Sequence, residues 1–145
     1  MTAVRLRTVD AFTERPFTGN PAAVLVLDEA PSDEWMAAVA RETNLSDTGF
    51  VIRQKHPDAD YLLRWFTRGG VEVDLCGHVT LAAGHCLFED GIPSPVKFST
   101  RSGVLTVSRR EDGIDAGAGI CSILCPFGRK TYVRCIRNRK QTVSS

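Results

Sequence analysis

The sequence has no apolar run of the roughly 18 residues that a membrane-spanning helix requires, although 43% of its 145 residues are hydrophobic. Its opening stretch, MTAVRLRTVDAF, has no apolar segment followed by a small-residue cleavage site, so we expect no secretory signal peptide. It also has no internal repeat, no heptad pattern, and no GxSxG, P-loop or dinucleotide-binding motif. We therefore expect an ordinary soluble globular protein that contacts no membrane.

Disulfide bonds are not expected either. The cysteines are odd in number and lack the spacing of a disulfide framework; they stand at positions 76, 86, 121, 125 and 135. Without an export signal, free thiols in a reducing cytoplasm are the better interpretation, so we predict a cytoplasmic protein. Cys121 and Cys125 have no second pair and the wrong spacing for a zinc knuckle.

Acidic residues are absent from the end of the chain. Residues 1–115 carry 12 basic and 17 acidic side chains, a net charge of −5, whereas residues 116–145 carry 6 basic and no acidic ones, a net charge of +6. The basic segment has neither helical nor strand periodicity, and it has no nucleic-acid-binding motif. We therefore predict a domain at 1–113 and a tail at 114–145 that is disordered or frame-shifted and binds no nucleic acid.

Hydrophobic periodicity predicts more strands than helices. Apolar runs, alternating or continuous, predict strands at 4–12, 22–27, 48–52, 61–67, 71–75, 96–100 and 104–109. An amphipathic pattern predicts a helix that starts near Ser32 and ends near Thr43. A second helix, from Val79 to Phe88, is apolar nearly all round and should be enclosed by other elements. The order predicts an α+β fold, a curled mixed β-sheet around a central helix.

The junction at Cys76-Gly77-His78 is the place where we expect chemistry. A strand that enters a buried helix at a glycine points backbone N–H groups, and the positive end of the helix dipole, at one spot that suits a carboxylate or a developing enolate. His78 is either a proton shuttle and hydrogen-bond donor or a cap for the local backbone. Cys76 is either an acid/base thiolate or, more commonly, a buried structural cysteine.

Two earlier polar residues are also candidates. Asp47 lies at a helix-to-strand corner, where it either projects into a cleft or serves as a turn former or surface charge. Asn20, between a glycine and a proline at a strand entrance, either presents its amide to a ligand or caps its own turn. His85 stands about 10.5 Å along the helix from His78, so it cannot share a small site with it.

Three blocks of sequence resemble the PhzF-like isomerase family of phenazine biosynthesis. They are VDAFTERPFTGNPAAVLVLD, ETNLSDTGFV and LRWFT…VEVDLCGHVTLAAGH, in the right order and at sensible spacing, and the likeness runs from Val9 to Arg110. The resemblance implies a diaminopimelate-epimerase-like fold of two similar halves, each a curled sheet around a central helix, with the active site between them. Residues 1–113 would form one half.

The resemblance also implies proton transfer on a small carboxylated metabolite, without a cofactor or metal. The family's acid is the Glu of an N-L-S-E-T motif, and the Gly-His pair of a G-H-A-T motif lines the site; the matching positions are Asp47, Gly77 and His78. Asn20 stands where relatives have a substrate-contacting Asn, and Cys76 where related epimerases place one of two catalytic cysteines. This predicts Asp47 and His78 as catalytic residues. The predicted substrate-binding residues are Asn20, Cys76 and Gly77.

The chain departs from the family pattern in ways that bear on activity. Asp47 replaces Glu and draws the carboxylate back by about one C–C bond, and a misplacement near 1 Å can cost roughly 100-fold in rate. Val79 replaces the usual Ala, and Arg68 stands where Pro is common. Nothing in 116–145 resembles the second half, so we expect an isomerase with impaired or no turnover. The alternatives are a non-catalytic binding or self-associating half-domain, paired as a homodimer through its exposed face, and an epimerase or racemase that uses Cys76.

Overall fold

The computed structural model describes residues 3–13, 18–111 and 113–116, and residues 133–144 by their backbone. Its elements are β1 (Ala3–Ala11), β2 (Asn20–Leu27), α1 (Asp33–Thr43), β3 (Asp47–Arg53), β4 (Tyr61–Thr67), β5 (Glu72–Val73), α2 (Gly77–Glu89), β6 (Val96–Thr100), β7 (Gly103–Arg110), β8 (Gly113–Ala116) and β9 (Val133–Ser144). Both predicted helices are confirmed, and so is every predicted strand except the one directly before α2, which is shorter.

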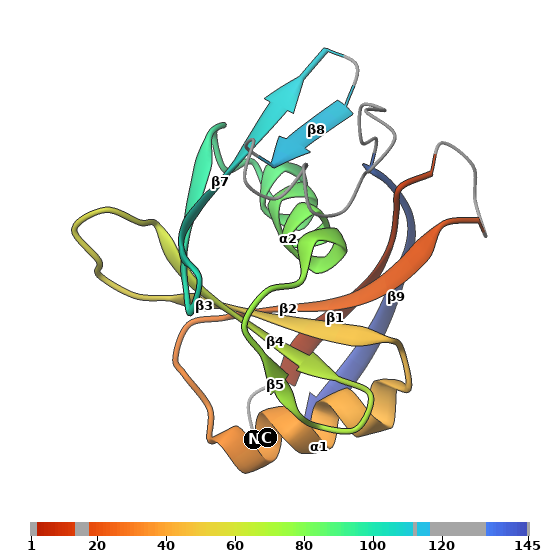
Figure 1. Ribbon diagram of the computed structural model, residues 1–145. Helices are drawn as coiled ribbons and strands as arrows, with labels where there is room; N and C mark the ends of the chain where they lie inside the picture. The colour runs from red at the N-terminus through yellow and green to blue at the C-terminus, as the bar shows by residue number, and fades with distance from the viewer. Residues whose placement is uncertain (1–2, 14–17, 112, 117–132, 145) are drawn as a thin grey trace.

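The strands form one mixed sheet in the order β8-β7-β6-β4-β3-β2-β1-β9, with β5 added on β4. Strands β2 and β3 are parallel and are joined through α1, whereas β4 and β6 are parallel and are joined through α2. Helix α2 contacts β7 and β8 at one end of this order and β1, β2 and β9 at the other, so the sheet curls around it (Figure 1). The predicted fold, a curled mixed sheet around a central helix, is confirmed.

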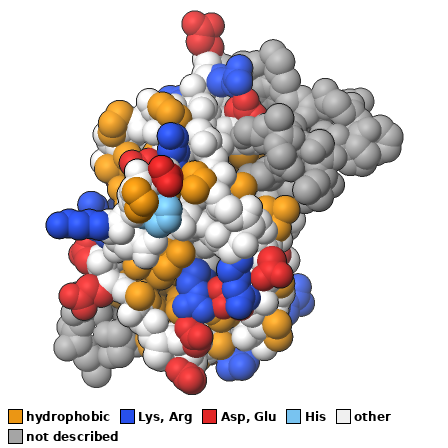
Figure 2. Space-filling view, turned by 60° about the vertical axis from the view of Figure 1, so that its left-hand side comes forward, with side chains coloured by type: hydrophobic (Ala, Val, Ile, Leu, Met, Phe, Trp, Pro, Cys, Tyr) orange, Lys and Arg blue, Asp and Glu red, His pale blue; other side chains and the backbone are white. Residues whose placement is uncertain are grey.

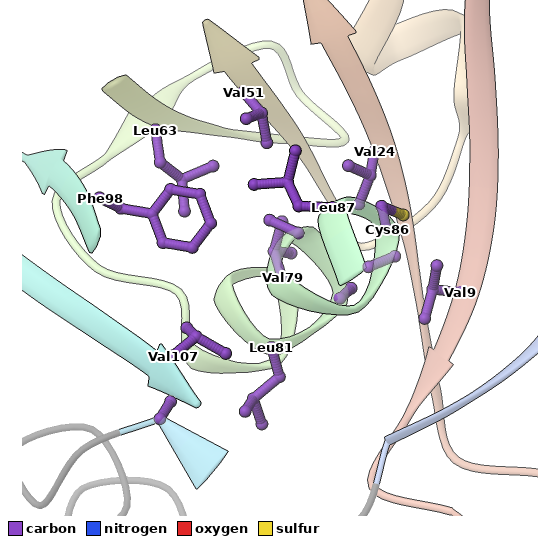
Figure 3. Packing of buried hydrophobic residues seen from close by; sticks show 14 of the residues in the cluster. Val9, Val24, Val51, Leu63, Val79, Leu81, Cys86, Leu87, Phe98 and Val107 are labelled. Carbon is purple, nitrogen blue, oxygen red and sulfur yellow. The ribbon is translucent and has the colours of Figure 1, made fainter. Parts of the chain in front are cut away.

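Side-chain alternation along the strands separates two cores. On β2, Val24 packs in the cluster that surrounds α2, whereas its neighbour Leu25 packs in the cluster under α1. On β3, Val51 packs in the cluster around α2 and its neighbour Phe50 packs in the cluster under α1. Figure 3 shows Val24 and Val51 directed toward Leu87 of α2. Since full burial of such side chains is worth about 1.5–3 kcal/mol each, the inner cluster fixes α2 firmly inside the sheet.

A buried arginine holds the C-terminal end of α2. Arg7 of β1, 4% exposed, donates from Nη1 to the Cys86 carbonyl oxygen and to Asp90 Oδ1, each over 3.0 Å, and its Nη2 pairs with Asp90 Oδ2. Burial lowers the pKa of Arg7, whereas the hydrogen bond to Asp90 raises it, and overall the pKa is raised. A cation at the last turn gives the Cys86 carbonyl a second donor, beside the Asp90 N–H at 3.1 Å, and opposes the negative end of the helix dipole. The contact therefore fixes the position of α2 along its axis.

The segment before α2 differs from its prediction. The strand is only Glu72–Val73, and Val71 is 62% exposed rather than part of a buried face. Glu72 accepts two hydrogen bonds from Arg64 of β4, over 2.8 and 2.7 Å, and lies 3.6 Å from Arg101. Val73 and Leu75 pack against the core as predicted, whereas Val71 does not, and the charge pairs of Glu72 add to the short ladder with β4. The Arg64 guanidinium also lowers the pKa of Glu72.

The end of the chain also differs in part from its prediction. The sequence predicts no regular structure after Asp115, whereas Val133–Ser144 form β9, antiparallel to β1, and Gly113–Ala116 form β8 on β7. The ladder between β1 and β9 has two register shifts, which break the two-residue alternation on which a strand prediction relies. Residues 117–132 lie outside the described residues. The boundary after residue 113 and the frame-shift stay predictions.

The helices in the described part of the chain are α1 and α2, and neither is long and apolar enough to cross a membrane. On the face shown in Figure 2, basic and acidic side chains lie side by side and do not gather into a broad surface of one sign. Among the pairs that the structure records are Arg64 with Asp33 and Arg101 with Asp74. The absence of a nucleic-acid partner stays a prediction.

Candidate active site

The starts of β2, β3 and α2 meet at one end of the sheet. Because β2 and β3 run parallel, Asn20 and Asp47 begin neighbouring strands at the same edge. Asp47 lies four residues before Val51 on β3, so both side chains point to the face that packs against α2. The first turn of the helix lies against this face, and His78 Nε2 is 3.7 Å from Asp47 Oδ2. The fold therefore brings together residues that are far apart in the sequence.

A chain of polar contacts links the predicted residues. Cys76 Sγ lies 3.3 Å from His78 Nδ1. On the other side of the ring, Ser46 Oγ lies 3.4 Å from His78 Nε2 and donates to Asn20 Oδ1 over 3.4 Å. Asp47 stands beside this chain, at an electrostatic rather than a hydrogen-bonding distance from the imidazole. All predicted side chains are thus in one place, and Ser46 connects them.

Ser46 is the residue that the sequence predictions missed. It immediately precedes Asp47 in the block ETNLSDTGFV, within the N-L-S motif that carried the resemblance. Only the acidic position of that motif was assigned a role. The sequence could have indicated this role, because a serine hydroxyl can donate to one neighbour and accept from another at the same time.

Asp47 is the most exposed of the three ionisable groups of the site. The side chain of Asp47 is 18% exposed, against 8% for His78, and Cys76 is 9% exposed as a residue. A molecule that arrives from solvent therefore meets the carboxylate before it meets the thiol. Asp47 is the best placed of these groups to exchange a proton with a substrate.

Burial keeps the other two groups neutral. It raises the pKa of the Cys76 thiol to about 12, with the charge of Asp47 adding to the effect and the Val79 backbone N–H opposing it. Burial also lowers the pKa of His78, and the attraction of Asp47 for a protonated ring offsets only part of this. At neutral pH the thiol is protonated, and both Asp47 and His78 Nδ1 lie within reach of its proton. If the thiol donates to Nδ1, the imidazole proton is on Nε2, toward Ser46 and Asp47.

The start of α2 supplies backbone donors. Cys76 is the N-cap residue but makes no side-chain capping bond, and the first turn carries no acidic residue. Thr80 holds the Cys76 carbonyl through its own N–H (3.1 Å) and its hydroxyl (2.7 Å), which fixes the first turn. The N–H groups of Gly77 and His78 belong to the set that has no partner inside a helix. Together with the helix dipole they favour an anion at this spot.

Three of these residues also offer metal ligands. One ligand atom from each of Asp47, Cys76 and His78 lies within 4.8 Å of the other two. In the part of the chain that the structure describes, no other group of three His, Cys, Asp or Glu side chains is close enough together to bind one ion. The thiol of Cys86, like that of Cys76, forms no disulfide.

Other polar features lie away from this cluster. His85, in the last part of α2, lies 3.4 Å from Glu89 and not near His78. A hollow of about 610 Å³ is lined by residues that include Arg53, Tyr61 and Ile92. Arg53 ends β3 whereas Asp47 begins it, and a strand of this length spans about 20 Å. Neither feature can share a small substrate with Asp47.

Comparison with known proteins decides the family. The model of the family described as "Phenazine biosynthesis-like protein" matches residues 9–142. The chain belongs to this family. The match extends beyond the likeness between Val9 and Arg110 that the motifs carry.

Relatives of the phenazine biosynthesis-like family are considerably longer than this chain. An uncharacterized isomerase of Halalkalibacterium halodurans is 50% identical over 119 residues, which cover 79% of this chain and 43% of the relative. The human phenazine biosynthesis-like domain-containing protein is 46% identical over 113 residues, or 72% of this chain and 38% of the relative. The chain thus spans less than half the length of the curated relatives it matches.

Solved structures of the family share the fold. A PhzF family protein of Enterococcus faecalis superposes with a TM-score of 0.71 at 40% identity, covering 78% of this chain and 43% of that one. A probable proline racemase from Agrobacterium radiobacter gives a TM-score of 0.53 at 15% identity, covering 74% of this chain and 38% of that one, which shows the fold alone. The epimerase-like fold implied by the resemblance is confirmed.

Proposed function

We propose that the chain carries the acid/base wall of an isomerase site that moves a proton on a small carboxylated metabolite. The observation that carries the proposal is the position of Asp47, whose partly exposed carboxylate lies 3.7 Å from His78 at the start of α2. The names of its relatives as isomerases support the reaction class. The substrate carboxylate would bind the first-turn N–H groups of Gly77 and His78.

Proton transfer follows from that arrangement. Asp47 takes a proton from a substrate carbon, and the electron pair of the broken C–H bond delocalises into an enolate-like system. The same carboxyl group then returns the proton to another carbon, so that substrate and product are isomers. The neutral His78 can donate its Nε2–H to the charge that develops, because a preorganised donor costs no reorganisation during the reaction. Ser46 keeps the ring oriented.

The remaining groups of the site would come from outside this chain. The match covers only 43% of a relative, and Asp47 is the most exposed of the three ionisable groups of the cluster. A site without its second wall neither excludes water nor holds its substrate firmly. We therefore propose that the chain alone turns over slowly, and that a second wall raises its rate.

Hydrogen exchange in D2O tests the proposal. The chain is incubated with a panel of small unsaturated and α-substituted carboxylic acids, with and without the C-terminal segment of the H. halodurans relative, and loss of C–H signals is followed by proton NMR. We expect exchange on at least one acid, lowered by about 10²–10⁴-fold in Asp47→Asn and retained or increased in Asp47→Glu. Equal exchange in wild type and Asp47→Asn would overturn the role of Asp47.

An epimerase that uses Cys76 is the second candidate, favoured by the 3.3 Å contact with His78 Nδ1. Its weakness is that the thiolate is the reactive form, whereas burial raises the pKa of this thiol to about 12. Cys76→Ser separates the two candidates, because it removes the exchange activity only if the thiol transfers the proton.

The self-associating half-domain stays a prediction. The exposed large apolar side chains of the described residues are Phe12, Val71 and Val104. Light scattering of the purified chain tests the predicted homodimer, and a monomer at high concentration would contradict it.

A further inference from the structure

We propose that Asp47, Cys76 and His78 form a binding site for a transition-metal dication, with Zn²⁺ as the best match to the three ligand types. The ligands come from β3 and from the first turn of α2, and they are a carboxylate oxygen, a thiolate sulfur and an imidazole nitrogen. Zinc takes this combination of donors in proteins.

The distances suit a single ion. Zinc bonds of about 2.0–2.3 Å at tetrahedral angles place neighbouring ligand atoms roughly 3.4–3.6 Å apart. The structure places Cys76 Sγ 3.3 Å from His78 Nδ1, and one ligand atom from each of the three residues lies within 4.8 Å of the other two. An ion bound through Nδ1 would lie on the Cys76 side of the ring, and the Asp47 carboxylate, which is 3.7 Å from the opposite nitrogen Nε2, would have to turn toward it.

The type of donor selects the ion. A thiolate and an imidazole are poor ligands for Mg²⁺ and Ca²⁺, which take oxygen donors almost throughout. Zn²⁺ and Co²⁺ accept sulfur, nitrogen and oxygen together. On binding, the Cys76 S–H bond breaks, the sulfur keeps the electron pair for the metal, and the proton goes to solvent. A water molecule can fill the fourth position at the open side of the cluster, near Asp47.

The site is held in place before an ion arrives. Thr80 binds the Cys76 carbonyl through two hydrogen bonds and so fixes the first turn of α2. Ser46 contacts the His78 ring from the side opposite the thiol, and such supporting contacts orient a metal-binding imidazole. An ion at this position would occupy the carboxylate that the proposed proton transfer needs, so it would inhibit that reaction and not assist it.

Cobalt binding tests the site without any assay of activity. In the full chain with Cys121, Cys125 and Cys135 each changed to Ser, Co²⁺ should give a thiolate-to-metal charge-transfer band that saturates at one ion per chain and disappears when Zn²⁺ is added. The band should be lost in Cys76→Ser and kept in Cys86→Ser. Asp47→Asn and His78→Gln should weaken the apparent affinity by at least the roughly 10–100-fold typical of a lost supporting contact, and His85→Gln should not.

Folding of each variant is checked by its thermal unfolding midpoint. Added Zn²⁺ should raise the midpoint of the parent chain and of Cys86→Ser, because an ion that binds only the native state stabilises it. It should not raise that of Cys76→Ser. Asp47→Asn changes a partly exposed side chain and gives a second test if Cys76→Ser unfolds. Absence of the charge-transfer band in the parent, or its persistence in Cys76→Ser, would overturn the proposal.

Discussion

Gly49 of β3 lies directly against Val79 of α2, so closely that a Cβ atom built on the glycine would overlap Val79 Cγ1. Gly49 follows Asp47 by two residues and Val79 follows His78 by one. The contact therefore sets the distance at which the helix start meets the strand that carries the carboxylate.

Gly49→Ala should push the start of α2 away from β3. Overpacking of a core costs about 1–3 kcal/mol, and the shift should also separate His78 from Asp47. Urea unfolding measures the first effect, and the exchange assay the second. Gly69→Ala is the matched control, because its Cβ would lie at an ordinary 3.7 Å from Thr67 Oγ1. Equal stability of the two variants would contradict the packing argument.

Arg7→Met should destabilise the protein from the other end of α2. It removes the partner of the Asp90 carboxylate and one of the two recorded donors to the Cys86 carbonyl. Loss of one partner of a buried pair costs about 3–5 kcal/mol, and we expect about 3 because Asp90 is 36% exposed. Urea unfolding should show little change for the control Arg53→Met, which removes an exposed pair with Asp28. Similar losses in both variants would argue against the clamp.

Asp47→Asn should lower two pKa values at once. The charge of Asp47 favours the protonated ring of His78 and disfavours the thiolate of Cys76. Without that charge, the His78 pKa should fall further below 6.5 and the Cys76 pKa should fall from about 12. NMR titration follows the first, and the pH dependence of iodoacetamide alkylation follows the second. The control Asp74→Asn, an exposed carboxylate, should move neither value.

Acidification below about pH 6.5 should destabilise the fold. Burial lowers the pKa of His78 and of His85 from 6.5, so the unfolded chain takes up protons at a higher pH than the folded chain. Stability is then lost as the pH falls from 6.5 toward the folded-state pKa values, with a slope of up to about 1.4 kcal/mol per pH unit for each proton. Urea unfolding between pH 7.5 and 5 measures this slope, and His85→Gln should reduce it. A flat profile would contradict the burial effect.

Much of the fold follows from local pattern. The strand at Tyr61–Thr67 has the predicted bounds, and the apolar run after Gly77 is enclosed as its composition indicates. Ser32 caps α1 by accepting a hydrogen bond from the Trp35 N–H, as its position before two acids predicts. These features depend on neighbours in sequence, so the sequence contains the information that locates them.

The rest depends on tertiary pairing. No local period indicates that β9 pairs with β1, because the partners are more than a hundred residues apart and the ladder is irregular. The alternation at Val71–Leu75 predicts a longer strand than Glu72–Val73, and it gives no sign of the ion pairs of Glu72 with Arg64 and Arg101. For the candidate site, the motifs identified Asp47 and His78, whereas the linking role of Ser46 appears only in the folded chain.

The pairing of β9 with β1 has a consequence for synthesis. Strand β1 is bordered by β2 on one side and, on the other, by β9, which is made more than a hundred residues later. Until those residues leave the ribosome, β1 presents an unpaired row of backbone N–H and C=O groups, which is the usual template for intermolecular pairing. The yield of folded protein should therefore fall when the β1 edge of the nascent chain meets other chains before β9 has paired with it.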